Sequence, residues 1–224
     1  MAEHDTLGFN HFWRQSWVRT DYHIIRGGIY GAIDMGPQAR KVAEGIGANP
    51  LYDATIFLMQ DDFLGAFANY TVGHRLLPSG ARIFRYKTKG GPGLPTHSFA
   101  EGVRHAPGTL SDAVNLAFLI GWKQIVLAGV DLYDSRYFFL QPDETLTQDT
   151  VSGTVVAGET NAFRGQRYDE PHNTFRGGVV EQMAEWHDAL ATQGVHVSVL
   201  NPRSLLASVM PVYEWPMRPA AVSR

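Results

Sequence analysis

One continuous segment, residues 108–132, constrains the fold more than any other part of the 224-residue chain. In GTLSDAVNLAFLIG (108–121), apolar residues recur at helical spacing, an N-cap is expected at Thr109 or Ser111, and a glycine ends the pattern. The run KQIVLAGVDL (123–132) follows directly and is apolar on both faces, which is typical of a central strand in a parallel sheet. A helix that leads straight into such a strand predicts an α/β fold.

Strand and helix patterns alternate along the rest of the chain. Further strands are expected at 6–12, 21–25, 53–60, 81–88 and 195–201, further helices at 36–47, 175–194 and 202–210, a loop at 89–98, and a buried helix face at Val179, Met183, Trp186 and Leu190. Residues 141–171 are polar and aperiodic, and loops of that length are usually lids or disordered. We therefore expect one domain over 1–224, with a largely parallel sheet flanked by helices and a lid loop at 141–171.

The composition excludes several classes of protein. The chain is 44% hydrophobic and 18% charged, with a net charge of −3, so no basic field marks it as a nucleic-acid platform. It has no cysteine, which excludes disulfides, thiolate zinc sites and cysteine nucleophiles. No apolar run approaches the roughly 18 residues of a membrane helix, and no basic-then-apolar signal pattern opens the sequence. We expect a cytoplasmic protein.

Two tyrosines follow the predicted central strand. Tyr133 and Tyr137 lie four residues apart in AGVDLYDSRYFF (128–139), just past the point where the strand should end. Ligands bind at the carboxyl ends of strands in such sheets, and two phenols there could donate hydrogen bonds to a phosphate leaving group. The alternative is that both rings are interior packing with one hydrated end.

Charged residues near the strand ends have competing interpretations. Asp131 and Asp134 could bind a metal, but a carboxylate that ends a strand more often anchors the following loop by accepting backbone N–H bonds. His172 lies between the long polar stretch and a helix, where it could act as a general base or simply be solvated. Gly108 and Thr109 begin a helix whose free N–H groups could hold an anion, or they are a plain cap.

Familiar active-site motifs are otherwise missing. The glycine-rich stretch KGGPGLP lacks the ending of a phosphate-binding P-loop. The chain also has no dinucleotide-binding fingerprint, no serine nucleophile elbow and no compact metal-binding histidine pattern.

Several of these pieces stand in a familiar order. GTLSDAVNLAFLIGWKQIVLAGVDLYDSRYFF, a polar gap, HNTFRGGVVEQMAEWHDAL and VHVSVLNPRSLLASVMP together resemble the bacterial sialyltransferases of glycosyltransferase family 42. The resemblance covers roughly residues 104–210, and GVDLYDSRY and NPRSLLA are its most specific parts. A related family of pterin-phosphorylating or uncharacterised proteins shares the G-x-D segment.

The resemblance implies a modified Rossmann-like fold of the GT-A type and an inverting, metal-independent transfer of sialic acid or a related acidic sugar from a CMP-activated donor to a glycan hydroxyl. No cofactor is implied beyond the CMP-sugar co-substrate, and a peripheral membrane contact or a homo-oligomer stays open. The implied roles are a catalytic base for His172, leaving-phosphate contacts for Tyr133 and Tyr137, and donor contacts for Asn10, Gly108, Thr109, Gly129 and Asp131.

The chain departs from the family pattern in three respects. The family starts with a strand and a Gly-Asn-Gly-Pro-Ser loop, and the resemblance implies that this sequence begins after that point, either as a fragment or with a donor site that is built differently. Gly108 and Thr109 stand where the family has Thr-Ser, and Arg26 lies where a second Asn is expected. The alternatives are a catalytically impaired nucleotide- or glycan-binding module, or a metal-dependent pterin or nucleotide phosphotransferase.

Overall fold

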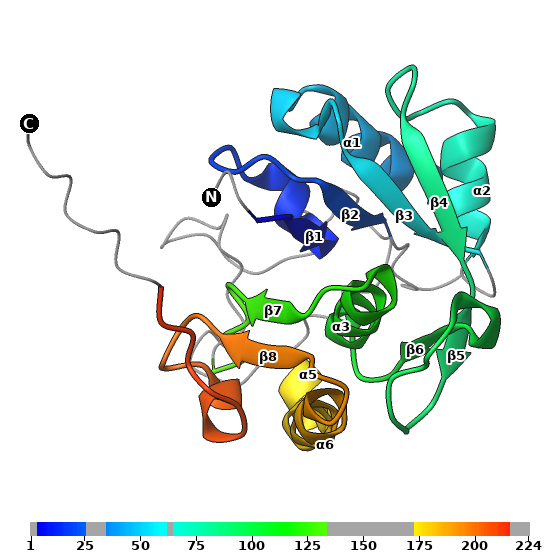
Figure 1. Cartoon of the computed structure of the whole chain (residues 1–224). Helices are drawn as coiled ribbons and strands as arrows, with labels where there is room; N and C mark the ends of the chain where they lie inside the picture. The colour runs from blue at the N-terminus through cyan, green and yellow to red at the C-terminus, as the bar shows by residue number, and fades with distance from the viewer. Residues whose placement is uncertain (1–3, 26–34, 62–64, 134–172, 216–224) are drawn as a thin grey trace, which may run out of the picture.

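The computed structural model describes residues 4–25, 35–61, 65–133 and 173–215, which form small parallel sheets flanked by helices (Figure 1). The strands are β1 (Leu7–Phe9), β2 (Tyr22–Ile25), β3 (Ile56–Gln60), β4 (Arg82–Tyr86), β5 (Thr88–Gly90), β6 (Val103–His105), β7 (Gln124–Leu127) and β8 (His196–Val199). The α-helices are α1 (Met35–Gly47), α2 (Gly65–Gly73), α3 (Thr109–Ile120), α5 (Asn173–Arg176) and α6 (Val179–Ala191), and the 3-10 helices are η1 (Asn10–Arg14), η2 (Pro50–Tyr52), η3 (Phe99–Glu101) and η4 (Leu205–Ser208). The predicted α/β class is confirmed, and the predicted lid lies outside the described residues.

The largest sheet has four parallel strands in the order β1-β2-β3-β4. Parallel neighbours require crossover connections, so helices cover both faces. Alternate residues of β3 show this division: Phe57 and Met59 pack with Ile46 of α1, whereas Leu58 packs with Leu116 of α3. The sheet is therefore the middle layer of a helix–sheet–helix arrangement.

Strand β4 is the edge of this sheet among the described strands. The alternating pattern at 81–88 predicted a half-buried strand, but the first four residues of β4 are exposed and Tyr86 alone is buried. The prediction was wrong in this respect because an edge strand has a neighbour on one side only. Both Ile83 and Phe84 remain about 39% exposed.

The pair β7–β8 forms a second parallel sheet, which packs on α6. The predicted buried face of this helix is confirmed, since all four of its named residues are buried. However, the helix expected over 175–194 is two helices, α5 and α6, because Gly178 adopts a φ of +83° between them. At Gly177, a Cβ atom would come within 3.0 Å of Pro107, so the break also allows a close approach to the start of α3.

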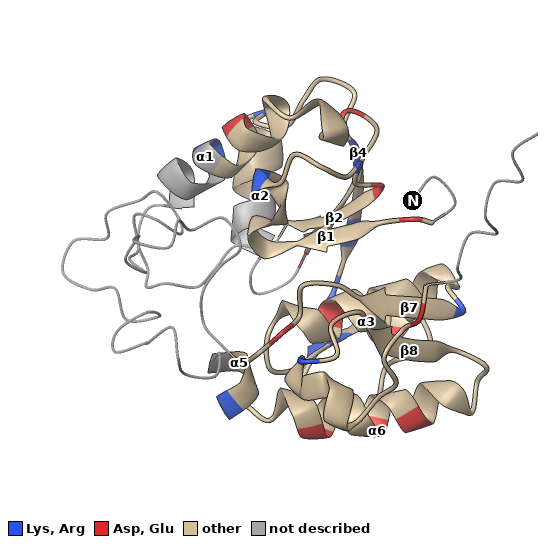
Figure 2. Ribbon diagram, turned by 90° about the vertical axis from the view of Figure 1, so that its left-hand side faces the viewer, with Lys and Arg blue, Asp and Glu red and all other residues tan. Residues whose placement is uncertain are grey.

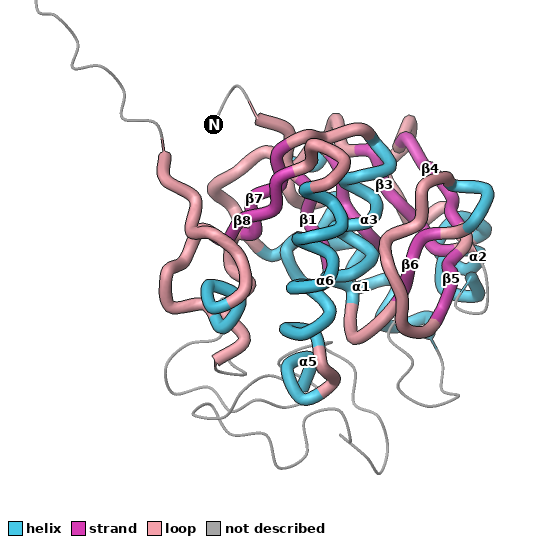
Figure 3. The backbone as a smooth tube through the Cα atoms, turned by 60° about the horizontal axis from the view of Figure 1, so that its bottom comes forward, coloured by secondary structure: helices cyan, strands magenta, loops and turns pink. Residues whose placement is uncertain are grey.

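The β7–β8 pair lies beside β1, on the side away from β4 (Figures 1 and 3). The side chain of Phe9 packs against both the β7–β8 core and the core under α3, which joins the two sheets. The central strand predicted over 123–132 is thus shorter, Gln124–Leu127, and among the described strands its ladder partner is β8 alone.

Three further predictions need correction. The strand expected at 6–12 ends at Phe9 because Asn10 adopts a left-handed φ of +54° and begins η1. The helix expected at 202–210 is the short η4, capped by the Ser204 side chain. The loop expected at 89–98 begins inside β5, which pairs in parallel with β6.

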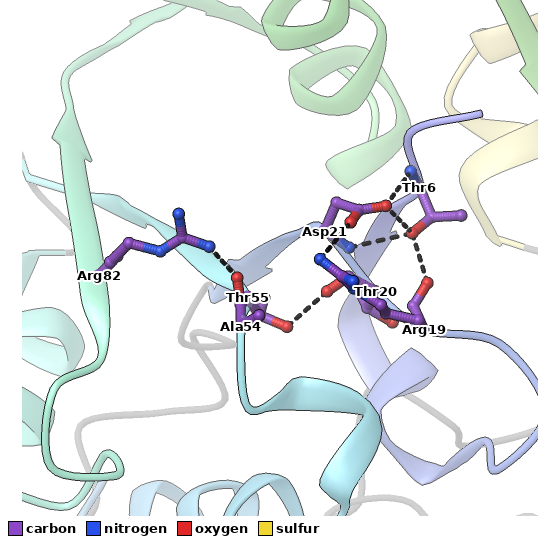
Figure 4. A network of polar contacts seen from close by, with 7 residues as sticks. All are labelled: Thr6, Arg19, Thr20, Asp21, Ala54, Thr55 and Arg82. Atoms are coloured by element: carbon purple, nitrogen blue, oxygen red, sulfur yellow. Dashed lines mark hydrogen bonds and ion pairs between the residues drawn. The ribbon is translucent and has the colours of Figure 1, made fainter. Parts of the chain in front are cut away.

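A polar network fixes the amino ends of the four-stranded sheet (Figure 4). The Thr6 backbone N–H donates to Asp21 Oδ2 at 3.0 Å, which ties β1 to β2. The Thr55 hydroxyl donates to the Thr20 carbonyl at 2.5 Å, and Arg82 donates to the carbonyl that precedes Thr55. These bonds lie at the amino ends of the strands and help to set the register between neighbouring strands. The carboxyl ends of the strands take no part in them.

Candidate functional site at the carboxyl edge

The carboxyl ends of the strands lie on one side of the molecule, which we call the carboxyl edge. The Tyr86 hydroxyl at the end of β4 lies 3.4 Å from Asp112 in the first turn of α3. At the opposite edge, the ring of Tyr22 at the start of β2 lies 5.7 Å from the ring of Trp122, which precedes β7. Asn10 follows the end of β1 and is exposed at the carboxyl edge.

Several hydrogen bonds join the segment after β7 to the segment after β8, three of them at Val130 and Asp131. The Asn201 amide donates to Asp131 Oδ1 at 2.7 Å, the Leu205 N–H donates to the Asp131 carbonyl at 3.0 Å, and the Ser204 hydroxyl donates to the Val130 carbonyl at 2.6 Å. Asp131 therefore anchors a loop, and among the described residues the donor to its carboxylate is the side chain of Asn201 in the segment after β8. The loop from residue 134 on, whose backbone N–H groups were the expected donors, lies outside the described residues.

The backbone turns sharply as it leaves β7. Gly129 adopts a φ of +69° and is exposed, and Leu132 adopts a φ of +66°. A left-handed conformation costs a branched residue roughly 1–2 kcal/mol, and the burial of the Leu132 side chain in the β7–β8 core offsets that cost. This turn directs Tyr133 away from the strand.

Tyr133 contacts Arg203, which sequence reasoning missed. An Arg203 guanidinium nitrogen donates to the Tyr133 hydroxyl at 3.3 Å, and Cζ lies 5.5 Å from the ring centroid. Both groups are accessible to water. A hydroxyl that accepts from a guanidinium still has its own hydrogen to donate, so this pair can bind an anion such as phosphate. The signal was available, because Arg203 lies inside the NPRSLLA segment.

The start of α3 differs from the predicted cap. The N-cap is Gly108, with a φ of +83° and no side-chain cap bond, and Thr109 is the buried first residue of the helix. Ser111 is not the cap; its hydroxyl donates to the Gly108 carbonyl at 2.9 Å and accepts from the Ala106 N–H at 3.0 Å. The serine thus closes the turn between β6 and α3.

The start of α3 also lies against the start of α5. A Cβ atom at Gly108 would come within 3.0 Å of Thr174 Cγ2 and 3.2 Å of its hydroxyl oxygen. Thr174 is two residues beyond His172. His172 and Tyr137 themselves lie outside the described residues, so their roles stay predictions.

A buried carboxylate and a histidine form a second polar group at this edge. Asp112 is fully buried, and its Oδ1 lies 2.6 Å from His105 Nδ1 at the end of β6. Its Oδ2 faces the Tyr86 hydroxyl. A carboxylate on Nδ1 fixes the orientation of an imidazole, as in hydrolase and transferase sites. The sequence segment RHAPGTLSD held both residues, but nothing in their spacing predicted the contact.

Another buried histidine belongs to the core. His23 of β2 is buried, its Nδ1 lies 3.2 Å from the Tyr52 hydroxyl, and burial lowers its pKa to about 3. Burial likewise raises the pKa of Tyr52 to about 12. Both groups are neutral over the physiological range, so they serve packing and not acid–base chemistry.

The described residues hold no group of three or more His, Cys, Asp or Glu that could bind a metal ion. Asp61, which directly follows β3, pairs with Arg85. An open cavity of about 560 Å³ lies between η1 and the end of α1, lined partly by Trp13 and Asn49, and none of the predicted site residues lines it.

Comparison with known proteins adds no relative: no family model, no curated protein and no solved structure matches the chain. In the described part of the chain, none of the helices has the length and apolar character needed to cross a membrane.

Proposed function

We propose that the chain is an inverting, metal-independent glycosyltransferase that moves sialic acid or a related acidic sugar from a CMP-activated donor to a glycan hydroxyl. The observation that carries this proposal is the junction between the segments after β7 and β8. These are the two most specific segments of the family resemblance, and the bonds of Asp131 with Asn201 and of Tyr133 with Arg203 join them at the carboxyl edge.

The geometry suits the departure of a nucleoside monophosphate. When the sugar–phosphate bond breaks, negative charge grows on the leaving phosphate, and a site without a metal needs other donors there. The Arg203 cation and the Tyr133 hydroxyl supply such donors. In this proposal Tyr137 adds a second phenol, and His172 removes the proton from the acceptor hydroxyl on the opposite face of the sugar.

The donor would extend toward the start of α3. Helix N-termini favour anions because their first N–H groups have no partner within the helix. Here Gly108 adds no side chain, and the approach of Thr174 brings the chain that follows His172 to this helix start. We further propose a modified Rossmann-like fold of the GT-A type, with residues 141–171 as the lid over the donor and with Asn10 and Gly129 among the donor contacts.

The test is transfer or hydrolysis of CMP-sialic acid by the purified chain. We expect turnover that EDTA leaves unchanged, that His172→Ala abolishes, and that Tyr133→Phe lowers at least tenfold without a change in melting temperature. Calorimetry with CMP separates the main alternatives, because tight CMP binding without turnover supports a binding module. Turnover of the histidine variant at the wild-type rate would remove His172 from the mechanism.

A further inference from the structure

The first turns of α3 hold the chain that leaves β6 through two bonds to its backbone. The Arg104 N–H donates to Asn115 Oδ1 at 2.7 Å. The Ala106 N–H donates to the Ser111 hydroxyl oxygen at 3.0 Å. Both acceptors are fully buried, because α3 lies between the four-stranded sheet and α6 (Figures 1 and 2). The backbone on either side of residue 105 is therefore fixed without any contribution from the side chain of that residue.

The side chain of His105 has a separate partner on the same helix. Its Nδ1 lies 2.6 Å from Asp112 Oδ1, and the other carboxylate oxygen lies 3.4 Å from the Tyr86 hydroxyl. The Asp112 side chain is fully buried, whereas the His105 side chain is 24% exposed. Since the backbone is already held on both sides, this contact orients the imidazole ring more than it holds the turn.

The surroundings of Asp112 make His105 its main source of positive charge. A buried carboxylate is costly unless donors or a cation face it. Among the described residues, neither a Lys nor an Arg pairs with Asp112. The guanidinium of Arg104 donates instead to the carbonyls of Gly90 and Leu94. The carboxylate is thus placed to stabilise the imidazolium that forms when His105 takes a proton.

The contact also determines which ring nitrogen takes that proton. A carboxylate only accepts hydrogen bonds, so Nδ1 carries a hydrogen, and in the neutral ring Nε2 then has the lone pair. A histidine that is oriented in this way is suited to general acid–base chemistry. We propose that His105 is an acid–base residue whose Nε2 removes a proton from a hydroxyl group, of water or of a sugar, at the start of α3. Asp112 is its positioning residue.

A purely structural role fits the pair less well. His23 is a structural histidine of this chain, and it is fully buried with its Nδ1 beside the Tyr52 hydroxyl. In contrast, His105 has a partly exposed ring and a carboxylate partner. A carboxylate costs far more to bury than a phenol, and this cost has no return in backbone bonds. The proposal does not depend on the transfer of a sugar from CMP.

The experiment is hydrolysis of p-nitrophenyl acetate by the purified full chain at neutral pH, because this reaction needs only a base that activates water. The water oxygen bonds to the acetyl carbon, the bond to p-nitrophenolate breaks, and the water proton passes to Nε2 and then to solvent. His105→Gln should lower the rate at least about tenfold, because the amide can still donate to Asp112 but cannot take a proton. The matched control is His196→Gln, which removes an exposed imidazole at the amino end of β8 and should leave the rate within about twofold of wild type.

A second variant tests the positioning role. Asp112→Asn keeps the size of the side chain but no longer fixes the tautomer, so the rate should fall at least about tenfold. In ¹⁵N NMR spectra, neutral His105 should be the Nδ1–H form in the wild type, and this preference should be lost in the variant. If Asp112→Asn does not fold, His105→Gln and the wild-type spectrum decide. Added lactose separates the two hydroxyl sources, since acetylated sugar in the products identifies a sugar hydroxyl and acetate alone identifies water.

Several results would overturn the proposal. These are a wild-type rate no higher than that of free imidazole, an unchanged rate in His105→Gln or in folded Asp112→Asn, and an Nε2–H form of His105 in the wild type. Equal rates in H₂O and D₂O would also overturn it, because a general base moves a proton in the transition state. Turnover of CMP-sialic acid tests the proposed function separately, since either activity can be present without the other.

Discussion

Gly108 gives the sharpest test of the carboxyl edge, because two independent features of the structure require a glycine there. Its φ of +83° and ψ of 170° fall in a region that is nearly exclusive to glycine, which costs another residue roughly 1–3 kcal/mol. A Cβ atom would also crowd Thr174 Cγ2 at 3.0 Å, for which we add about 1 kcal/mol. Gly108→Ala should therefore lower the free energy of unfolding by about 2–4 kcal/mol.

A double-mutant cycle separates the two terms. Thr174→Ala removes the crowding atoms but leaves the backbone strain, so in the double variant the penalty of the Gly108 substitution should fall by about 1 kcal/mol. Urea unfolding measures each free energy, with equal m-values required for the comparison.

The outcome bears directly on the proposed function. A coupling within about 0.3 kcal/mol of zero would show that the chain after His172 does not lie against the start of α3. A cost below about 0.5 kcal/mol for Gly108→Ala alone would refute the backbone conformation as well.

Three further changes have definite expected results. Gly45→Ala would place a Cβ atom 2.1 Å from the Trp13 ring, so we expect a loss of about 1–3 kcal/mol in urea unfolding, and a gain would contradict this packing. Arg203→Ala should weaken CMP binding five- to tenfold by calorimetry, with partial recovery in Arg203→Lys, and unchanged affinity would exclude the Tyr133–Arg203 pair from the donor site. The folded-state pKa of His23 is about 3 and the unfolded value about 6.5, so protons bind the unfolded state first. The free energy of unfolding should fall as the pH drops below 6.5, by about 2 kcal/mol at pH 5 for this group. In His23→Asn, the slope of the unfolding free energy against pH should be smaller by the contribution of one proton.

The elements that the sequence predicted well are those that a local pattern of apolar residues specifies. The buried face of α6 follows from helical spacing, and β2, β3 and β8 follow from short apolar runs, because both periodicities act within a few residues. The break at Gly177 and Gly178 was missed for the same reason. Helical spacing continues across 175–194, and the need for a close approach to Pro107 is a tertiary fact.

The contacts of the candidate site also differ in how far local sequence patterns could predict them. Asp131 and Asn201 are 70 residues apart, yet adjacent parallel strands release their following loops at one edge, so a pairing of β7 with β8 would have predicted a contact between those loops. The packing of Gly108 against Thr174 depends instead on how two helix starts meet, which no strand order determines. The Asp131 anchor could thus be anticipated in kind, while its Asn201 donor required knowledge of the sheet. The junction that supports a donor site is a property of the topology more than of any single motif.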